Sequence, residues 1–291
     1  MLKVLIALDG SPSALCAAQH VADLARRGTP IEAVLLTVQP PIMAGEIGVI
    51  ASAQVAQAER ARAAAEVLGP VCLIMLKAGV PYVEEVLSDA PATAITACAS
   101  RHAADVIMMG SRGLSSLKRL VLGSVSKDVL HLTDLPVTLF KSGKIRRLND
   151  PARLLVAVDG SSSALRAAEY AAKLAREIPR CEVHLLHVRP SITYGGVLVS
   201  SRDEVIKQWS ATDAEAAFAE PGEVFDRAGL PHTLHIEEGE PAACIVKAAR
   251  TLAIDLVFIG TRGLGRVASV AIGSVADAVL RQAPIPVTMV R

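Results

Sequence analysis

Apolar runs of strand length alternate with longer segments of helical period along the first half of the chain. The predicted strands are residues 2–8, 31–38, 105–110 and 136–140, with a weaker and more polar strand at 82–88. The predicted helices are residues 12–27, 91–100, 124–132 and an Ala-rich segment 51–77, which Gly69-Pro70 should break or kink. Continuous apolar strands between helices are typical of a parallel sheet covered on both faces.

The second half of the chain repeats the first at a constant offset of 150 residues. KVLIALDGSPSALCAAQHVADLAR from Lys3 aligns with RLLVAVDGSSSALRAAEYAAKLAR from Arg153, and 14 of these 24 positions are identical. No gap is needed, so both copies should contain the same elements. We therefore predict two tandem α/β domains, residues 1–141 and 153–291, joined by a polar linker at 142–152. Right-handed crossovers make each domain a doubly wound, Rossmann-like, five-stranded parallel sheet.

Each copy carries a glycine-spaced loop after its fourth strand. The loops are Gly110-x2-Gly113-x9-Gly123-Ser124 and, 150 residues later, Gly260-x2-Gly263-x9-Gly273-Ser274. Glycine lets a backbone approach an anion closely, and the second half of each loop opens a helix whose free N–H groups favour phosphate. Ser124 has two interpretations, as the N-cap of that helix or as a donor to a phosphate oxygen. The recurrence of the spacing in both copies favours the ligand.

Two further positions lie at the same end of the predicted sheet, where ligands of such folds bind. Asp9 and Asp159 follow the first strand of each copy and either accept hydrogen bonds from a nucleoside or only turn the chain into the next helix. Val38 and Val188 end the second strands, where they either form an apolar wall for a base or belong to the core.

Composition excludes several classes of protein. Hydrophobic residues make up 52% of the chain, aromatic residues 3%, and the net charge is +1, so neither a basic surface nor stacking rings for nucleic acid are expected. No apolar run reaches the ~18 residues of a membrane span. The N-terminal apolar run is too short for a signal peptide, so we expect a cytoplasmic protein. The five cysteines are interpreted as buried small hydrophobes rather than as disulfides or metal ligands.

These motifs together resemble the universal stress protein family. The glycine loops, the ALDGS and AVDGS turns after the first strands, the AGVP and AGLP segments and the closing PVT strands carry the resemblance through nearly all of both copies. It implies two adenine nucleotide alpha hydrolase-like domains that bind ATP, with or without Mg²⁺. It also implies pairing of the closing strands into an intramolecular pseudo-dimer, with room for a further homodimer.

The resemblance also assigns residues to the nucleotide. In the first copy these are Ala7, Asp9, Val38, Met109, Gly110, Arg112, Gly113, Gly123, Ser124, Val125 and Ser126. In the second copy they are Ala157, Asp159, Val188, Ile259, Gly260, Arg262, Gly263, Gly273, Ser274 and Val275. The two arginines either point at phosphate or are solvated. Because the Ser126 hydroxyl is absent at Ala276, the first site should be better furnished for a triphosphate.

The expected function is that of a nucleotide-responsive stress regulator rather than an enzyme. No G-x4-G-K-[ST] motif is present, and none of the seven histidines shows a metal spacing linked to the glycine loops. Two alternatives stay open. One is a slow ATPase, and the other is a nucleotide-free module for dimerisation or partner binding through an exposed sheet edge.

Overall fold

The computed structural model describes residues 1–39, 51–111, 122–142, 147–189, 193–194, 197–198, 204–261, 263 and 272–291. The chain forms two compact units, Met1–Arg147 and Leu148–Arg291. Their division lies inside the segment predicted as a linker. Leu148 is buried, and Asn149 donates from Nδ2 to Asp255 Oδ1 at 3.0 Å, so these two residues belong to the second unit.

The first unit contains four helices and five strands among its described residues. In chain order they are β1 Leu2–Leu8, α1 Pro12–Arg26, β2 Ile31–Gln39, α2 Ala51–Ala78, β3 Tyr82–Ser88, α3 Pro91–Arg101, β4 Val106–Gly110, α4 Ser124–Leu132 and β5 Val137–Phe140.

The second unit repeats this order and adds a short antiparallel pair, β8 with β9. Its elements are β6 Ala152–Val158, α5 Ser162–Glu177, β7 Cys181–Arg189, β8 Thr193–Tyr194, β9 Val197–Leu198, α6 Glu204–Arg227, β10 His232–Glu238, α7 Pro241–Thr251, β11 Leu256–Gly260, α8 Ser274–Gln282 and β12 Val287–Val290.

Within each unit the large strands form a parallel sheet in the same order. The first unit runs β3-β2-β1-β4-β5 and the second β10-β7-β6-β11-β12. In the first unit, α1 packs against α2, while α3 packs against α4. Strand order reverses between β1 and β4, and correspondingly between β6 and β11. The predicted doubly wound α/β fold is therefore confirmed, and its switch point defines where a ligand can enter.

Small side chains let the helices approach the sheet closely. The inner face of α1 is formed by Ala14, Ala17, Ala18 and Ala22 around Val21, each at most 1% exposed. Helix α1 packs against β1, β4 and β5. This packing builds a dense core from aliphatic residues, as the low aromatic content predicts.

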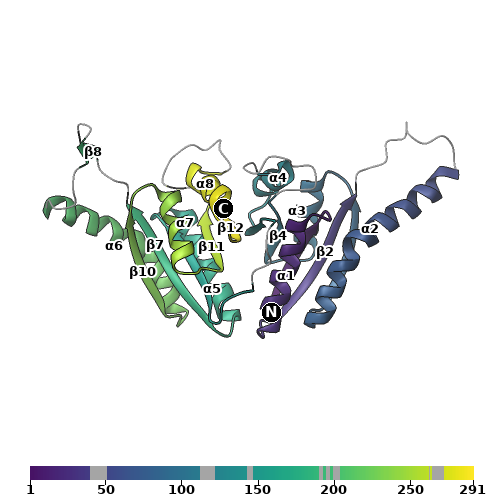
Figure 1. The fold of residues 1–291 in the computed structure, drawn as a ribbon, viewed down its shortest axis with the longest axis horizontal. Helices are drawn as coiled ribbons and strands as arrows, with labels where there is room; N and C mark the ends of the chain where they lie inside the picture. Colours follow the sequence, from purple (N-terminus) through teal and green to yellow (C-terminus); the bar gives the residue numbers. More distant parts are fainter. Residues whose placement is uncertain are drawn as a thin grey trace. The chain divides into compact units, whose positions relative to one another are not determined.

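The predicted break in the long helix does not occur. Helix α2 runs through Pro70 as one element of 28 residues, and it bends along its length (Figure 1). Proline removes the hydrogen bond to the carbonyl of Glu66, four residues earlier. In α2 that loss does not end the helix.

Candidate functional site

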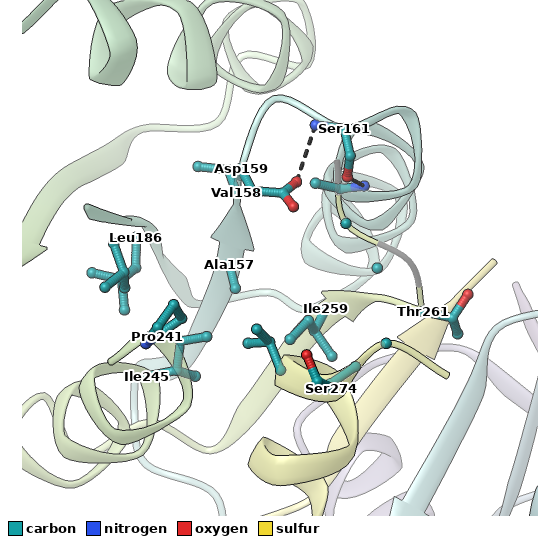
Figure 2. A pocket seen from close by; sticks show the side chains of 17 residues that line it. Ala157, Val158, Asp159, Ser161, Leu186, Pro241, Ile245, Ile259, Thr261 and Ser274 are labelled. Atoms are coloured by element: carbon teal, nitrogen blue, oxygen red, sulfur yellow. Dashed lines mark hydrogen bonds between the residues drawn. The ribbon is translucent and has the colours of Figure 1, made fainter. Parts of the chain in front are cut away.

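A cavity of about 530 Å³ opens in the second unit at the carboxyl ends of β6 and β11, on either side of the switch in strand order (Figure 2). It is within the usual size range of small-molecule sites, ~300–1,000 Å³. Its lining residues are Ala157, Val158, Asp159, Ser161, Ala164, Leu186, Val188, Pro241, Ile245, Ile259, Gly260, Thr261, Gly263, Gly273, Ser274, Val275 and Ala276.

One side of the cavity is apolar. Leu186 and Val188 come from β7, and Pro241 and Ile245 from the first two turns of α7. Figure 2 shows Leu186, Pro241 and Ile245 together beside the end of β6. Flat apolar walls of this kind suit the faces of a planar ring system, because burying them removes apolar surface from water.

The polar side begins at the turn after β6. Asp159 Oδ1 accepts a hydrogen bond from the backbone N–H of Ser161 at 3.0 Å, and Ser161 Oγ accepts one from Ala164 N at 3.2 Å (Figure 2). The turn interpretation of Asp159 is thus correct for one carboxylate oxygen. The other, Oδ2, lies against Gly263, where an added Cβ would be only 2.8 Å away. The glycine loop therefore approaches this carboxylate closely.

The start of α8 faces the same cavity. The N-cap is Gly273, which offers no side-chain cap, and Ser274 is the exposed first residue of the helix. The same holds for Gly123 and Ser124 at α4. The interpretation of Ser124 as an N-cap is therefore wrong. Backbone N–H groups in a first turn have no intrahelical acceptor, so this end of the cavity is suited to an anion.

The first glycine of each loop has a packing role. A Cβ on Gly260 would lie 2.8 Å from the carbonyl carbon of Ser163 and 2.9 Å from Ala164 N. On Gly110 it would lie 3.2 Å from Ala14 N. Glycine is required here because the first turn of α5, or of α1 in the first unit, lies directly against the end of the strand. It need not touch a ligand to be essential.

The first unit places those of its predicted residues that the structure describes in the corresponding positions. Ala7 on β1 pairs with Met109 on β4, and Asp9 Oδ1 accepts from Ser11 N at 2.9 Å. Val38 lies near the end of β2, and Val125 in the first turn of α4. Equivalent residues therefore lie at the carboxyl ends of the strands in both units.

The prediction that Ser126 donates to a phosphate is wrong. Its side chain is buried, at 2% exposure, and its Oγ donates to the carbonyl of Gly110 at 3.0 Å. The hydroxyl ties α4 to the end of β4 and is not free to donate to a ligand. The absence of this hydroxyl at Ala276 therefore removes a structural hydrogen bond from the second unit.

Nine of the ten residues predicted for the second site line one cavity. The tenth, Arg262, lies outside the described residues, as do Arg112 and Gly113 of the first copy.

Sequence reasoning missed part of the apolar wall. Leu186, Pro241 and Ile245 line the cavity, and none was predicted. A signal was present, because residues of the same type stand 150 positions earlier in the first copy, at Leu36, Pro91 and Ile95.

Each unit is a doubly wound α/β domain with an aspartate after its first strand and, at the same end of its sheet, a helix that begins without a side-chain cap. The model of the universal stress protein family matches residues 1–141 and 152–291. The chain belongs to the universal stress protein family and carries two tandem domains of it.

Individual proteins of this family are similar to the chain. A putative universal stress protein of Staphylococcus haemolyticus is 34% identical over 140 residues, covering 47% of this chain and 83% of that protein. One of Methanocaldococcus jannaschii is 27% identical over 139 residues, covering 48% and 81%. The crystal structure of a universal stress protein from Archaeoglobus fulgidus is similar along 99% of this chain and 98% of its own, with 27% identity and a TM-score of 0.70.

A search for transmembrane helices in the described part of the chain finds no helix with the length and hydropathy needed to cross a bilayer.

Proposed function

We propose that this protein binds an adenine nucleotide, ATP foremost, in the cavity of the second unit and at the equivalent place in the first. The observation that carries the proposal is the cavity of about 530 Å³ in the second unit, which gathers nine predicted nucleotide residues between an apolar wall and a helix start. The base would lie along Leu186, Val188 and Ile245. The phosphates would meet the first turn of α8, and any Mg²⁺ would arrive with the triphosphate.

We further propose that the bound nucleotide regulates rather than reacts, in a cytoplasmic stress response. Among the described residues that line the cavity, Asp159 is the one ionisable side chain, and one of its oxygens already holds the turn. Phosphoryl transfer needs a positioned metal and a group that orients the nucleophile. The chemistry of the described lining favours binding over turnover.

The pairing of β5 with β12 into a pseudo-dimer, and a homodimer of chains, also belong to this proposal. Each of these strands closes its own sheet beside a single neighbour within its unit, β4 or β11. Light scattering on the purified chain with and without ATP measures the number of chains per particle.

The nucleotide proposal is tested by calorimetric titration with ATP, ADP and AMP, after measurement of the nucleotide carried through purification. Asp159→Asn is the sharpest variant, because the amide oxygen still accepts from Ser161 N while the charge is lost. Hydrogen bonds to charged groups contribute ~1.5–3 kcal/mol, so we expect at least ~10-fold weaker binding at that site with the fold preserved. Asp9→Asn is the matched change in the first unit.

Two outcomes would overturn the proposal. If neither unit binds any of the three nucleotides, the chain is a partner-binding module. If ATP is hydrolysed over many turnovers and Asp159→Asn or Asp9→Asn abolishes the turnover, the enzymatic alternative is correct.

A further inference from the structure

A cluster of potential metal ligands lies in the first unit, away from the residues assigned to nucleotide. Glu85 projects from β3, while Cys98 and His102 stand four residues apart at the end of α3. One donor atom from each of the three lies within 4.8 Å of the others. In the part of the chain that the structure describes, this is the one group of three such donors.

The spacing on the helix explains why the three side chains meet. Residues i and i+4 share one face of a helix, so Cys98 and His102 both point toward the strand that precedes α3. Glu85 Oε1 is 2.7 Å from His102 Nε2. Cys98 is 1% exposed, whereas the side chains of Glu85 and His102 are about one quarter exposed. The thiol thus closes the inner side of the cluster, and the outer side is open to an incoming ion.

We propose that Glu85, Cys98 and His102 bind a thiophilic divalent cation, Zn²⁺ being the best match. Sulfur, imidazole nitrogen and carboxylate oxygen are the three ligand types that zinc takes in proteins. With bonds of ~2.0–2.3 Å and tetrahedral angles, neighbouring ligand atoms stand about 3.4–3.6 Å apart. The donors reach that spacing by side-chain adjustments of about 1 Å. Binding releases the thiol proton to solvent, and water completes the coordination.

Arg101 competes with the cation for the same groups. Its guanidinium is 3.1 Å from Glu85 Oε2 and 3.6 Å from Cys98 Sγ. Because the Arg101 side chain is 55% exposed, it can swing into water when the metal arrives. The arrangement therefore predicts a site whose affinity is held down by one arginine.

The second unit shows that the fold does not require this cluster. At the positions 150 residues on, the same elements carry His235, Ala248 and Leu252 in place of the three ligands, and Thr251 in place of Arg101. His235 Nε2 lies 3.0 Å from His184 Nδ1, a pair with two donors only. Ala248, Leu252 and Thr251 therefore show which residues the same fold accepts in place of Cys98, His102 and Arg101.

The test is a titration of the reduced, full-length chain with Co²⁺, whose thiolate complexes give a charge-transfer absorption, followed by displacement with Zn²⁺. We expect one equivalent of cation and a thiolate band. Cys98→Ala should abolish the band, and His102→Leu and Glu85→Gln should weaken binding by at least ~10-fold, the effect of losing even an outer-shell partner. Arg101→Thr should tighten binding.

Matched controls come from the other unit. Cys244→Ala takes the residue found at Ala94 of the first copy, and His235→Gln breaks the two-histidine pair; both should keep the band. The melting temperature of each metal-free variant shows whether it is folded, and Zn²⁺ should raise the melting temperature of the unsubstituted chain but not of folded Cys98→Ala.

The inference does not rest on nucleotide binding and is refuted separately from it. No thiolate band in the unsubstituted chain, a band that survives Cys98→Ala, or weaker binding in Arg101→Thr would each overturn the metal site.

Discussion

The substitution Gly260→Ala tests whether close packing, rather than ligand contact, fixes the first glycine of the loop. The added Cβ would lie 2.8 Å from the Ser163 carbonyl carbon and 2.9 Å from Ala164 N. Favourable contacts between carbon atoms begin at ~3.5 Å, so the first turn of α5 must retreat by about 0.7 Å. Overpacking of this kind costs ~1–3 kcal/mol. We therefore expect a loss of that size in the free energy of unfolding of the second unit.

The assay is urea unfolding followed by tryptophan fluorescence. The single tryptophan of the chain is Trp209, in α6 of the second unit. Gly222→Ala is the matched control, because its Cβ would meet only His232 Nε2, at an ordinary 3.7 Å. Replacing a helical glycine should stabilise the unit by ~0.5–1 kcal/mol.

The two alanine variants thus have opposite expected signs. If Gly260→Ala lowers the free energy of unfolding by less than about 0.5 kcal/mol, below the overpacking range, the contact with α5 does not constrain the position. A normal fold combined with abolished nucleotide binding would then assign Gly260 to the ligand.

Four further predictions address single contacts. Ser126→Ala should cost ~0.5–1.5 kcal/mol of unfolding free energy and leave nucleotide affinity unchanged in calorimetry, since its hydroxyl bonds the backbone. Asp277→Lys should tighten nucleotide binding in the second unit by about threefold to thirtyfold, because an acidic residue in the first turn of α8 opposes an anion by ~0.3–1 kcal/mol and a basic one attracts it by a similar amount; unchanged affinity would place the phosphates elsewhere. Ala253→Gly should raise the melting temperature, because alanine has φ +52° there. Burial lowers the pKa of His20 from 6.5 to about 4, so stability present above pH 6.5 should fall as the pH drops toward 4; His20→Phe should flatten that slope in unfolding free energy against pH.

Periodicity and the internal repeat predicted most of the fold. Strand bounds such as Leu2–Leu8 match because the apolar run from Val4 to Leu8 is too short for a helix and is buried along its whole length. The expectation for Gly69-Pro70 was wrong in part, since tertiary packing keeps α2 helical through a residue that would end an isolated helix.

The site was predictable where backbone geometry dictates the residue type. Loop glycines and the strand-end aspartate are local features, and the cavity contains both. Ser126 could not be assigned, because its partner, the carbonyl of Gly110, is 16 residues away and a serine beside a glycine loop fits either role. Ile245 was missed because an apolar residue on a helix is normally interpreted as core, and only its recurrence at Ile95 in the first copy pointed to a shared wall.

The contact between Gly260 and the first turn of α5 has a consequence for how this protein can change. Because a side chain at Gly260 would press on α5, substitution of this residue is a poor route to a changed ligand preference, both in evolution and in the laboratory. Variation in ligand preference is left to the apolar side chains that line the cavity, such as Val188 on β7 and Ile245 on α7. Libraries built for altered ligand preference should be placed on those two positions, with the loop glycine held constant.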